Sequence, residues 1–89
     1  MSYRVEISPD AQKEITALSG YVRAPALRLL HSLEENPRPP RAKELHDKPN
    51  VYRLWLAKKW RIVYRVEKDP QRVLVLRVRL KELVDYESL

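Results

Sequence analysis

The chain has 89 residues, enough for one domain (residues 1–89) with a single modest core. It has no cysteine, only two histidines (His31 and His46) and no apolar run at its N-terminus, so we expect no disulfide, no metal, no cofactor, no membrane association and a cytoplasmic location. The net charge of +6 is uneven: residues 51–81 carry ten Lys or Arg against two acids, whereas residues 82–89 carry three acids and no cation.

The first part of the chain predicts a strand and two helices. Tyr3–Ile7 alternates apolar and polar residues, which is typical of a strand. Ser8 is a good N-cap for a helix that we expect to end at Gly20, the only glycine. A second helix is expected from about Val22 to Glu35, where the segment NPRPPR ends it. The short gap between the helices predicts a helix hairpin.

The second part predicts three strands. After a stretch that we expect to be irregular, AKELHDKPN, the strands cover about Val51–Leu56, Trp60–Val66 and Arg72–Arg79, with turns at AKK and EKDPQ. The last segment, KELVDYESL, is expected to be a short helix or a tail. The predicted fold class is therefore α+β, in the order β-α-α-β-β-β-(α), with a mainly antiparallel sheet and the helix hairpin packed on one face.

Strand alternation sorts these residues onto two faces of the sheet. The apolar face, which the helices should cover, is expected to hold Tyr52, Leu54, Leu56, Ile62, Tyr64, Val66, Leu74, Leu76 and Val78. The opposite face should hold Arg53, Trp55, Arg61, Arg65, Arg77 and Arg79, with Val63, Val73 and Val75 between them. We expect this second face to be open and to be the working surface.

Arginines beside a tryptophan suit a phosphate backbone with unpaired bases. The guanidinium group offers a planar pair of donors to phosphate, and Trp55 offers a ring on which a base can stack. We therefore interpret Trp55, Arg65, Arg77 and Arg79 as RNA-binding residues. The alternatives are that the charges form a solvated face, that Trp55 covers arginine stems, and that Arg65 and Arg77 pair with Glu67 or with acids of the C-terminal tail.

The segments ENPRPP, LHDKPNVYRLWLAKKWRIVYRV and the C-terminal VDY resemble the RelE/ParE superfamily of bacterial toxins over nearly the whole chain. The resemblance implies a RelE-like fold and a toxin of a type II toxin–antitoxin system. Members of the RelE branch cut messenger RNA in the ribosomal A site, whereas members of the ParE branch act on DNA gyrase without cutting RNA. Members of both branches are neutralised by a small antitoxin, so a RelB-like partner is implied.

The resemblance also implies a set of catalytic residues. Arg61, in WRIVY, matches a phosphate-binding arginine of the family, and Arg53 matches the basic residue that follows the VY tyrosine. Trp55 stands where RelE itself has a lysine, and Arg79 or Lys81 takes the place of the basic residue after the last strand. Tyr86 corresponds to the C-terminal tyrosine. The implied catalytic set is Arg61, Arg53, Lys81 and Tyr86.

This set lacks an obvious general base. Arginine does not lose its proton in proteins, and we find no histidine or carboxylate assigned to the same face. The leading interpretation is a ribosome-dependent messenger RNA endoribonuclease that inhibits translation. The alternatives are a ParE-like inhibitor that binds DNA gyrase and an inactive toxin relic that still binds its antitoxin.

Overall fold

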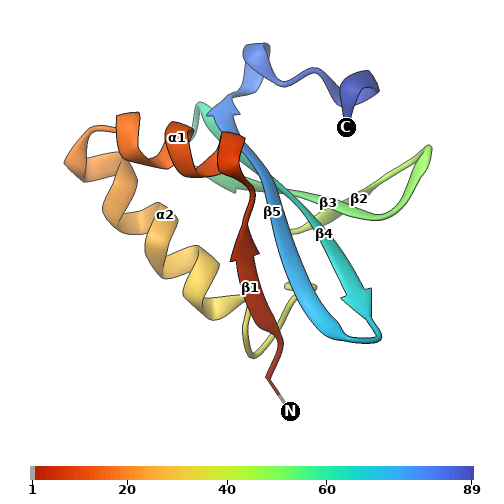
Figure 1. Cartoon of the computed structure of the whole chain (residues 1–89). Helices are drawn as coiled ribbons and strands as arrows, with labels where there is room; N and C mark the ends of the chain where they lie inside the picture. Colours follow the sequence, from red (N-terminus) through yellow and green to blue (C-terminus); the bar gives the residue numbers. More distant parts are fainter. Residues whose placement is uncertain (1) are drawn as a thin grey trace.

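The computed structural model describes residues 2–89 as two helices packed on one face of a five-stranded sheet (Figure 1). Neighbouring strands lie in the order β1-β5-β4-β3-β2, with β1 parallel to β5 and every other pair antiparallel. The α+β fold is confirmed. The elements are β1 (Arg4–Ile7), α1 (Pro9–Ala17), α2 (Gly20–Ser32), β2 (Lys43–Leu45), β3 (Lys48–Leu56), β4 (Trp60–Lys68), β5 (Gln71–Leu80) and the short 3₁₀ turns η1 (Lys81–Leu83) and η2 (Tyr86–Ser88).

The junction of the helix hairpin lies earlier in the chain than the sequence predicts. Ser8 caps α1 as expected, with its hydroxyl oxygen accepting from the Ala11 N–H at 3.2 Å. The expectation that Gly20 ends the first helix is wrong: Gly20 is the first residue of α2, and Ser19 precedes it as the N-cap. Arg23 of α2 donates to carbonyl oxygens at the end of α1, including that of Leu18, and so holds the two helices together.

One expectation about the faces of the sheet is wrong in β5. Tyr64 pairs with Val75 whereas Val63 pairs with Arg77, so Leu76 is an extra residue that forms a β-bulge. The bulge shifts the alternation by one residue, so Val73 and Val75 point into the core instead of Leu74 and Leu76. The helix-side core contains Ala11, Ile15, Leu18, Val22, Ala26, Leu30, Leu33, Leu54, Leu56, Ile62, Tyr64, Val66, Val73, Val75 and Val78.

The segment that we expected to be irregular forms a hairpin. Lys43 of β2 pairs with Arg53 of β3, and the hairpin turns at His46 and Asp47. Asn50 has a positive φ of 67°, and its N–H donates to a carboxylate oxygen of Glu44 at 2.7 Å. The sheet therefore extends one strand further than predicted, with Lys43 in its edge strand β2 and Arg41 just before that strand.

The side of the sheet opposite the helices is partly covered. Val51 and Val63 are buried, although neither belongs to the helix-side core. Residues 84–89 run along this side in Figure 1, and Lys48 Nζ at the start of β3 donates to the Leu89 main-chain oxygen at 3.2 Å. We expected this face to be open, but the C-terminal segment lies against part of it. Within residues 2–89, no helix has the length and apolar character needed to cross a membrane.

Candidate nucleic-acid interface

The face of the sheet opposite the helices, called here the outer face, carries the predicted arginines in rows across neighbouring strands. Directly paired residues lie on the same face, so strand pairing identifies each row. One row is Trp55, Arg61 and Arg79; the next is Lys43, Arg53, Val63 and Arg77; a third is Val51, Arg65 and Leu74. The predicted residues of β3, β4 and β5 therefore do share one face.

Arg61 is buried beneath Trp55. Only 2% of Arg61 is exposed, and its Nη1 donates to the carbonyl oxygens of Lys58 (3.2 Å) and Trp60 (2.7 Å). Its guanidinium carbon lies 4.2 Å from the centroid of the Trp55 ring, which is a cation–π contact, while 58% of Trp55 is exposed. The Arg61 Nε is buried without a hydrogen-bond partner in the described part of the chain. An anion can reach this guanidinium group from the Trp55 side only if the indole moves.

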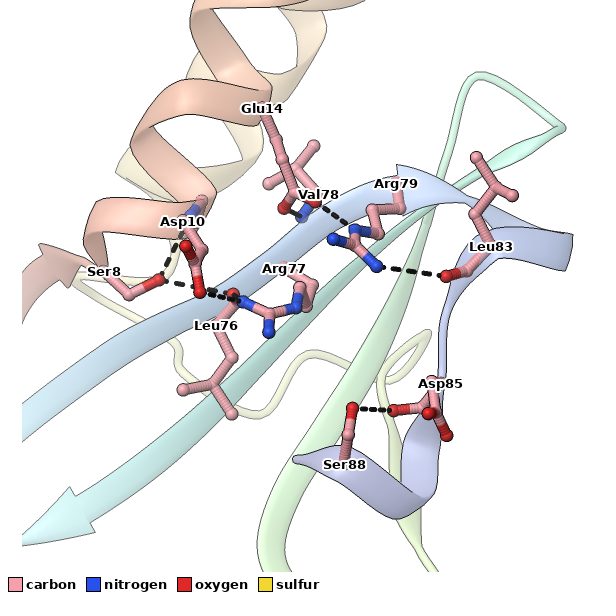
Figure 2. A network of polar contacts seen from close by, with 11 residues as sticks. Ser8, Asp10, Glu14, Leu76, Arg77, Val78, Arg79, Leu83, Asp85 and Ser88 are labelled. Carbon is pink, nitrogen blue, oxygen red and sulfur yellow. Dashed lines mark hydrogen bonds and ion pairs between the residues drawn. The ribbon is translucent and has the colours of Figure 1, made fainter.

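Arg77 and Arg79 are paired with acids of α1 (Figure 2). β5 extends beyond the end of β1, and α1 packs beside this free edge, where the Ser8 N–H donates to the Val75 oxygen at 2.9 Å. Arg77 Nη1 lies 3.0 Å from Asp10 Oδ2, and Arg79 Nε donates to Glu14 Oε2. Glu14 Oε1 also accepts from the Val78 N–H at 2.9 Å. A phosphate that binds either arginine would therefore compete with a carboxylate for its positive charge.

Arg65 also has an acidic neighbour. Its Nε lies 3.5 Å from Glu67 Oε2, although this contact lacks hydrogen-bond geometry. Glu67 is bound more closely by Arg72, at 2.7 Å, and Arg72 also reaches Glu6 at 3.0 Å. The hydrogen bond from Arg72 lowers the pKa of Glu67 below its ordinary value. Arg65 therefore contacts Glu67 as expected, whereas the acid that pairs with Arg77 is Asp10 of α1 and not Glu67 or an acid of the tail. Both contacts neutralise part of the outer face.

Apart from the buried Arg61, the cations beside the outer face that have no carboxylate partner among residues 2–89 lie at its β2–β3 edge. Among residues 2–89, no carboxylate forms an ion pair with Arg41, Lys43 or Arg53. Arg41, Lys43 and Trp55 line a cleft of about 260 Å³. Sequence reasoning missed Arg41 and Lys43 because it assigned their segment to no strand. Their spacing of two residues was the signal that could have placed them on one face.

Lys81 and Tyr86 lie in the C-terminal segment. The Lys81 N–H donates to the Lys59 oxygen at 2.8 Å, so Lys81 lies at the same end of the sheet as the turn beside Arg61. The Tyr86 hydroxyl is buried and has no hydrogen-bond partner among the residues described. The same part of the chain shows no group of His, Cys, Asp and Glu that could hold a metal ion.

Tyr52 and Tyr64 belong to the helix side of the sheet. Tyr64 is fully buried, and its hydroxyl donates to the Pro37 oxygen at 2.9 Å. Its ring stacks on Tyr52 with centroids 5.8 Å apart, and Arg38 Nε donates to the Tyr52 hydroxyl at 3.0 Å. Burial raises the pKa of Tyr64. These tyrosines hold the segment after α2 against the sheet and are remote from the outer face.

The chain is similar to toxins of known structure and to one family of toxin sequences. Residues 5–82 match the family described as the ParE toxin of the type II toxin–antitoxin system parDE. A mutant of the Escherichia coli toxin RelE in its free state is 28% identical, with 99% of this chain and 93% of that chain covered and a TM-score of 0.84.

Two complexes show the same fold. RelE in the intact Escherichia coli RelBE toxin–antitoxin complex is 28% identical, with 89% and 96% of the two chains covered and a TM-score of 0.80. The archaeal RelE–RelB complex from Pyrococcus horikoshii OT3 matches in fold alone, with 21% identity, 94% and 100% coverage and a TM-score of 0.77. No curated protein sequence matches the chain.

Proposed function

The chain belongs to the RelE/ParE superfamily of type II toxin–antitoxin toxins, and from this premise we propose that it binds messenger RNA on the ribosome and cuts it. The observation that carries the proposal is the outer face, where β3 and β4 bring Arg53, Trp55, Arg61 and Arg65 together. Such a face suits a single-stranded phosphate backbone, because guanidinium groups bind phosphate and an exposed indole stacks on bases.

Cleavage would proceed by attack of the ribose 2′-oxygen on phosphorus as the bond to the 5′-oxygen breaks. One proton must leave the 2′-hydroxyl, and one must reach the departing 5′-oxygen. Arg53 supplies positive charge directly at the phosphate oxygens, and Arg61 contributes its charge from beneath the Trp55 indole. Lys81 and Tyr86 are the implied residues that can exchange a proton. The ribosome would hold the message in the reactive geometry.

An antitoxin is the expected protein partner. The Escherichia coli and Pyrococcus horikoshii relatives form complexes with RelB. We propose a RelB-like antitoxin for this chain, with an acidic segment that complements its net charge of +6. Association should then weaken as salt is added.

A second candidate function is ParE-like inhibition of DNA gyrase without RNA cleavage. Trp55 stands where the resemblance expects a lysine, and its indole covers Arg61. With Arg77 and Arg79 bound to Asp10 and Glu14, few groups are left for catalysis. A toxin relic that only binds its antitoxin would share these features.

Two assays on one preparation separate these functions. The purified protein is added to programmed ribosomes, and message cleavage is mapped by primer extension; the same protein is tested in a gyrase supercoiling assay. We expect A-site cleavage that falls at least roughly 100-fold in Arg53→Ala. Arg53 has no ion-pair partner in the described residues, so the variant should fold normally.

The control is Arg28→Ala, which removes one exposed cation from α2 on the other side of the molecule. It should cleave like the unaltered protein. Intact message together with inhibited supercoiling would replace the leading proposal with the gyrase function. Activity in neither assay, with antitoxin binding retained, would indicate a relic.

A further inference from the structure

We propose that the cleft between Trp55, Arg41 and Lys43 is a binding subsite for one nucleotide of a single-stranded nucleic acid, with the base on the indole and the phosphate on the two cations. The subsite lies at the β2–β3 edge of the sheet, beside Arg61 and not on it. The identity of the ligand, a messenger RNA strand, rests on the proposed function, whereas the geometry of the subsite does not.

The indole of Trp55 is held in place and still accessible. Arg61 lies against its ring at 4.2 Å, which fixes the plane of the indole, while 58% of the residue remains exposed. An exposed aromatic ring held by a buried cation is a stacking platform that loses little freedom when a base binds.

The two cations line the same cleft as the indole. Lys43 pairs with Arg53, and continuing this register places Arg41 across from Trp55, just before β2 begins. Arg41 and Lys43 are exposed, and both line the cleft of about 260 Å³ with the indole. The side chain that can stack on a base and the two cations that can bind a phosphate thus lie side by side at one edge of the sheet.

Charge separates this edge from the rest of the outer face. On β5, Arg72, Arg77 and Arg79 each contact a carboxylate within 3.0 Å or less. At the β2–β3 edge, the nearby acid Glu44 pairs with Tyr52 on the helix side, and it accepts from the Asn50 N–H. An incoming anion therefore meets uncompensated positive charge here and paired charge on β5. An acidic peptide would satisfy the cations, but it would leave the indole without a stacking partner.

Fluorescence of Trp55 reports on this cleft directly. The chain has two tryptophans, so Trp60→Phe leaves Trp55 as the only reporter. In this background, a single-stranded oligoadenylate of about eight nucleotides should quench the fluorescence as its bases stack. Trp55→Ala in the otherwise unaltered chain should raise the Kd for the same oligonucleotide by roughly 5- to 100-fold, measured by fluorescence anisotropy of a labelled strand.

The cations are tested by salt dependence. The double variant Arg41→Ala/Lys43→Ala should lower the slope of log K against log salt by about 1.4, or about 0.7 per cation on a single strand. Lys13→Ala/Arg28→Ala removes the same charge from α1 and α2 and should leave the slope unchanged.

Three results would overturn the subsite: equal affinity for an abasic strand of the same length, an unchanged Kd in Trp55→Ala, or equal quenching by polyglutamate. Because these measurements need no ribosome, stacking without message cleavage would refute only the proposed function. Cleavage that persists without stacking at Trp55 would refute only the subsite.

Discussion

The guanidinium carbon of Arg61 lies 4.2 Å from the centroid of the Trp55 ring, so the most exposed aromatic side chain of the sheet covers its most buried cation. Through this contact, the same arginine contributes to the stability of the fold and to the geometry of the candidate interface. Arg61 stabilises the β3–β4 turn by donating hydrogen bonds to the carbonyl oxygens of Lys58 and Trp60, and it also packs against the Trp55 indole. A change at Arg61 should therefore alter both folding and ligand binding.

Arg61→Ala should lower the free energy of unfolding by about 2–3 kcal/mol, because two carbonyl oxygens lose their donor and a cavity forms below Trp55. Arg61→Lys keeps the charge but cannot reach both oxygens with the same geometry, and it should cost about 1–2 kcal/mol. Urea unfolding measures both values. A loss below about 0.5 kcal/mol in the alanine variant would show that Arg61 is not a structural residue, and its activity could then be interpreted without correction for folding.

Much of the fold could be predicted because its periodic signals are strong. Ser8 at the start of α1 and the alternation from Val51 to Val66 both lead to the observed elements. The run Val73–Leu76 could not be assigned to faces, because all four residues are apolar and either phase of the alternation fits. Only the pairing with β4 reveals that Leu76 is the residue in the bulge.

The candidate site was predicted less completely, since its charges depend on long-range contacts. The arginines of β3 to β5 share a face as expected, but the acids that neutralise Arg77 and Arg79 come from α1, more than 60 positions earlier in the chain. No local pattern links them. Likewise, Arg41 and Lys43 matter only because the pairing of β2 with β3 brings them to the cleft beside Trp55.

Removing the α1 acids should increase the free positive charge of the outer face. Glu14→Gln should cost about 1 kcal/mol, because it loses the charge-assisted bond to Arg79 but can still accept from the Val78 N–H. The freed guanidinium group should steepen the salt dependence of single-stranded RNA binding by about 0.7. Filter binding across a salt series measures the slope.

Asp10→Asn is the matched variant at the exposed partner of Arg77. Since 64% of the Asp10 side chain is exposed, its ion pair should contribute less than about 1 kcal/mol, and the variant should unfold almost like the unaltered protein. A slope that stays constant in both variants would mean that Arg77 and Arg79 do not face the bound strand.

Acid should weaken the contact between Glu67 and Arg72. The pKa of Glu67 is lowered in the folded state, chiefly by the hydrogen bond from Arg72, so this contact stabilises the fold fully above the unfolded-state pKa of about 4.3. The stabilisation is lost as pH falls through the lower folded-state pKa. The free energy of unfolding should therefore fall more steeply below pH ~5 in the unaltered protein than in Glu67→Gln. The control is Glu35→Gln at an exposed site; matching pH profiles for all three proteins would contradict the prediction.

The β3–β4 turn contains two residues in the left-handed region, Ala57 with φ 46° and Lys58 with φ 63°. Glycine adopts this conformation without the clash of a Cβ atom, so Ala57→Gly should raise the free energy of unfolding by about 0.5–1 kcal/mol. Ala24→Gly, at an exposed position of helix α2, should instead lower it by about 1 kcal/mol. Urea denaturation of the pair gives the comparison; destabilisation in both variants would show that Ala57 is not strained.

A substitution at Tyr86 should change the rate of RNA cleavage without lowering the stability of the fold. Its hydroxyl is buried without a hydrogen-bond partner in residues 2–89, so burial disfavours it. Tyr86→Phe keeps the ring and should leave the free energy of unfolding unchanged or raise it by up to about 1 kcal/mol. If the phenol exchanges a proton during RNA cleavage, the same variant should cleave message roughly 100-fold more slowly.

Tyr86→Ala removes the ring as well as the hydroxyl, so comparison with Tyr86→Phe gives the contribution of the ring alone. The tail lies against the side of the sheet where Val51 and Val63 are buried, so loss of the ring should cost about 1–3 kcal/mol. Urea unfolding and primer extension on programmed ribosomes are measured for both variants. Full cleavage by Tyr86→Phe would assign Tyr86 a packing role only. Slow cleavage by Tyr86→Phe without a loss of stability would place the Tyr86 hydroxyl among the reacting groups. The slow cleavage could not then be explained by a destabilised fold.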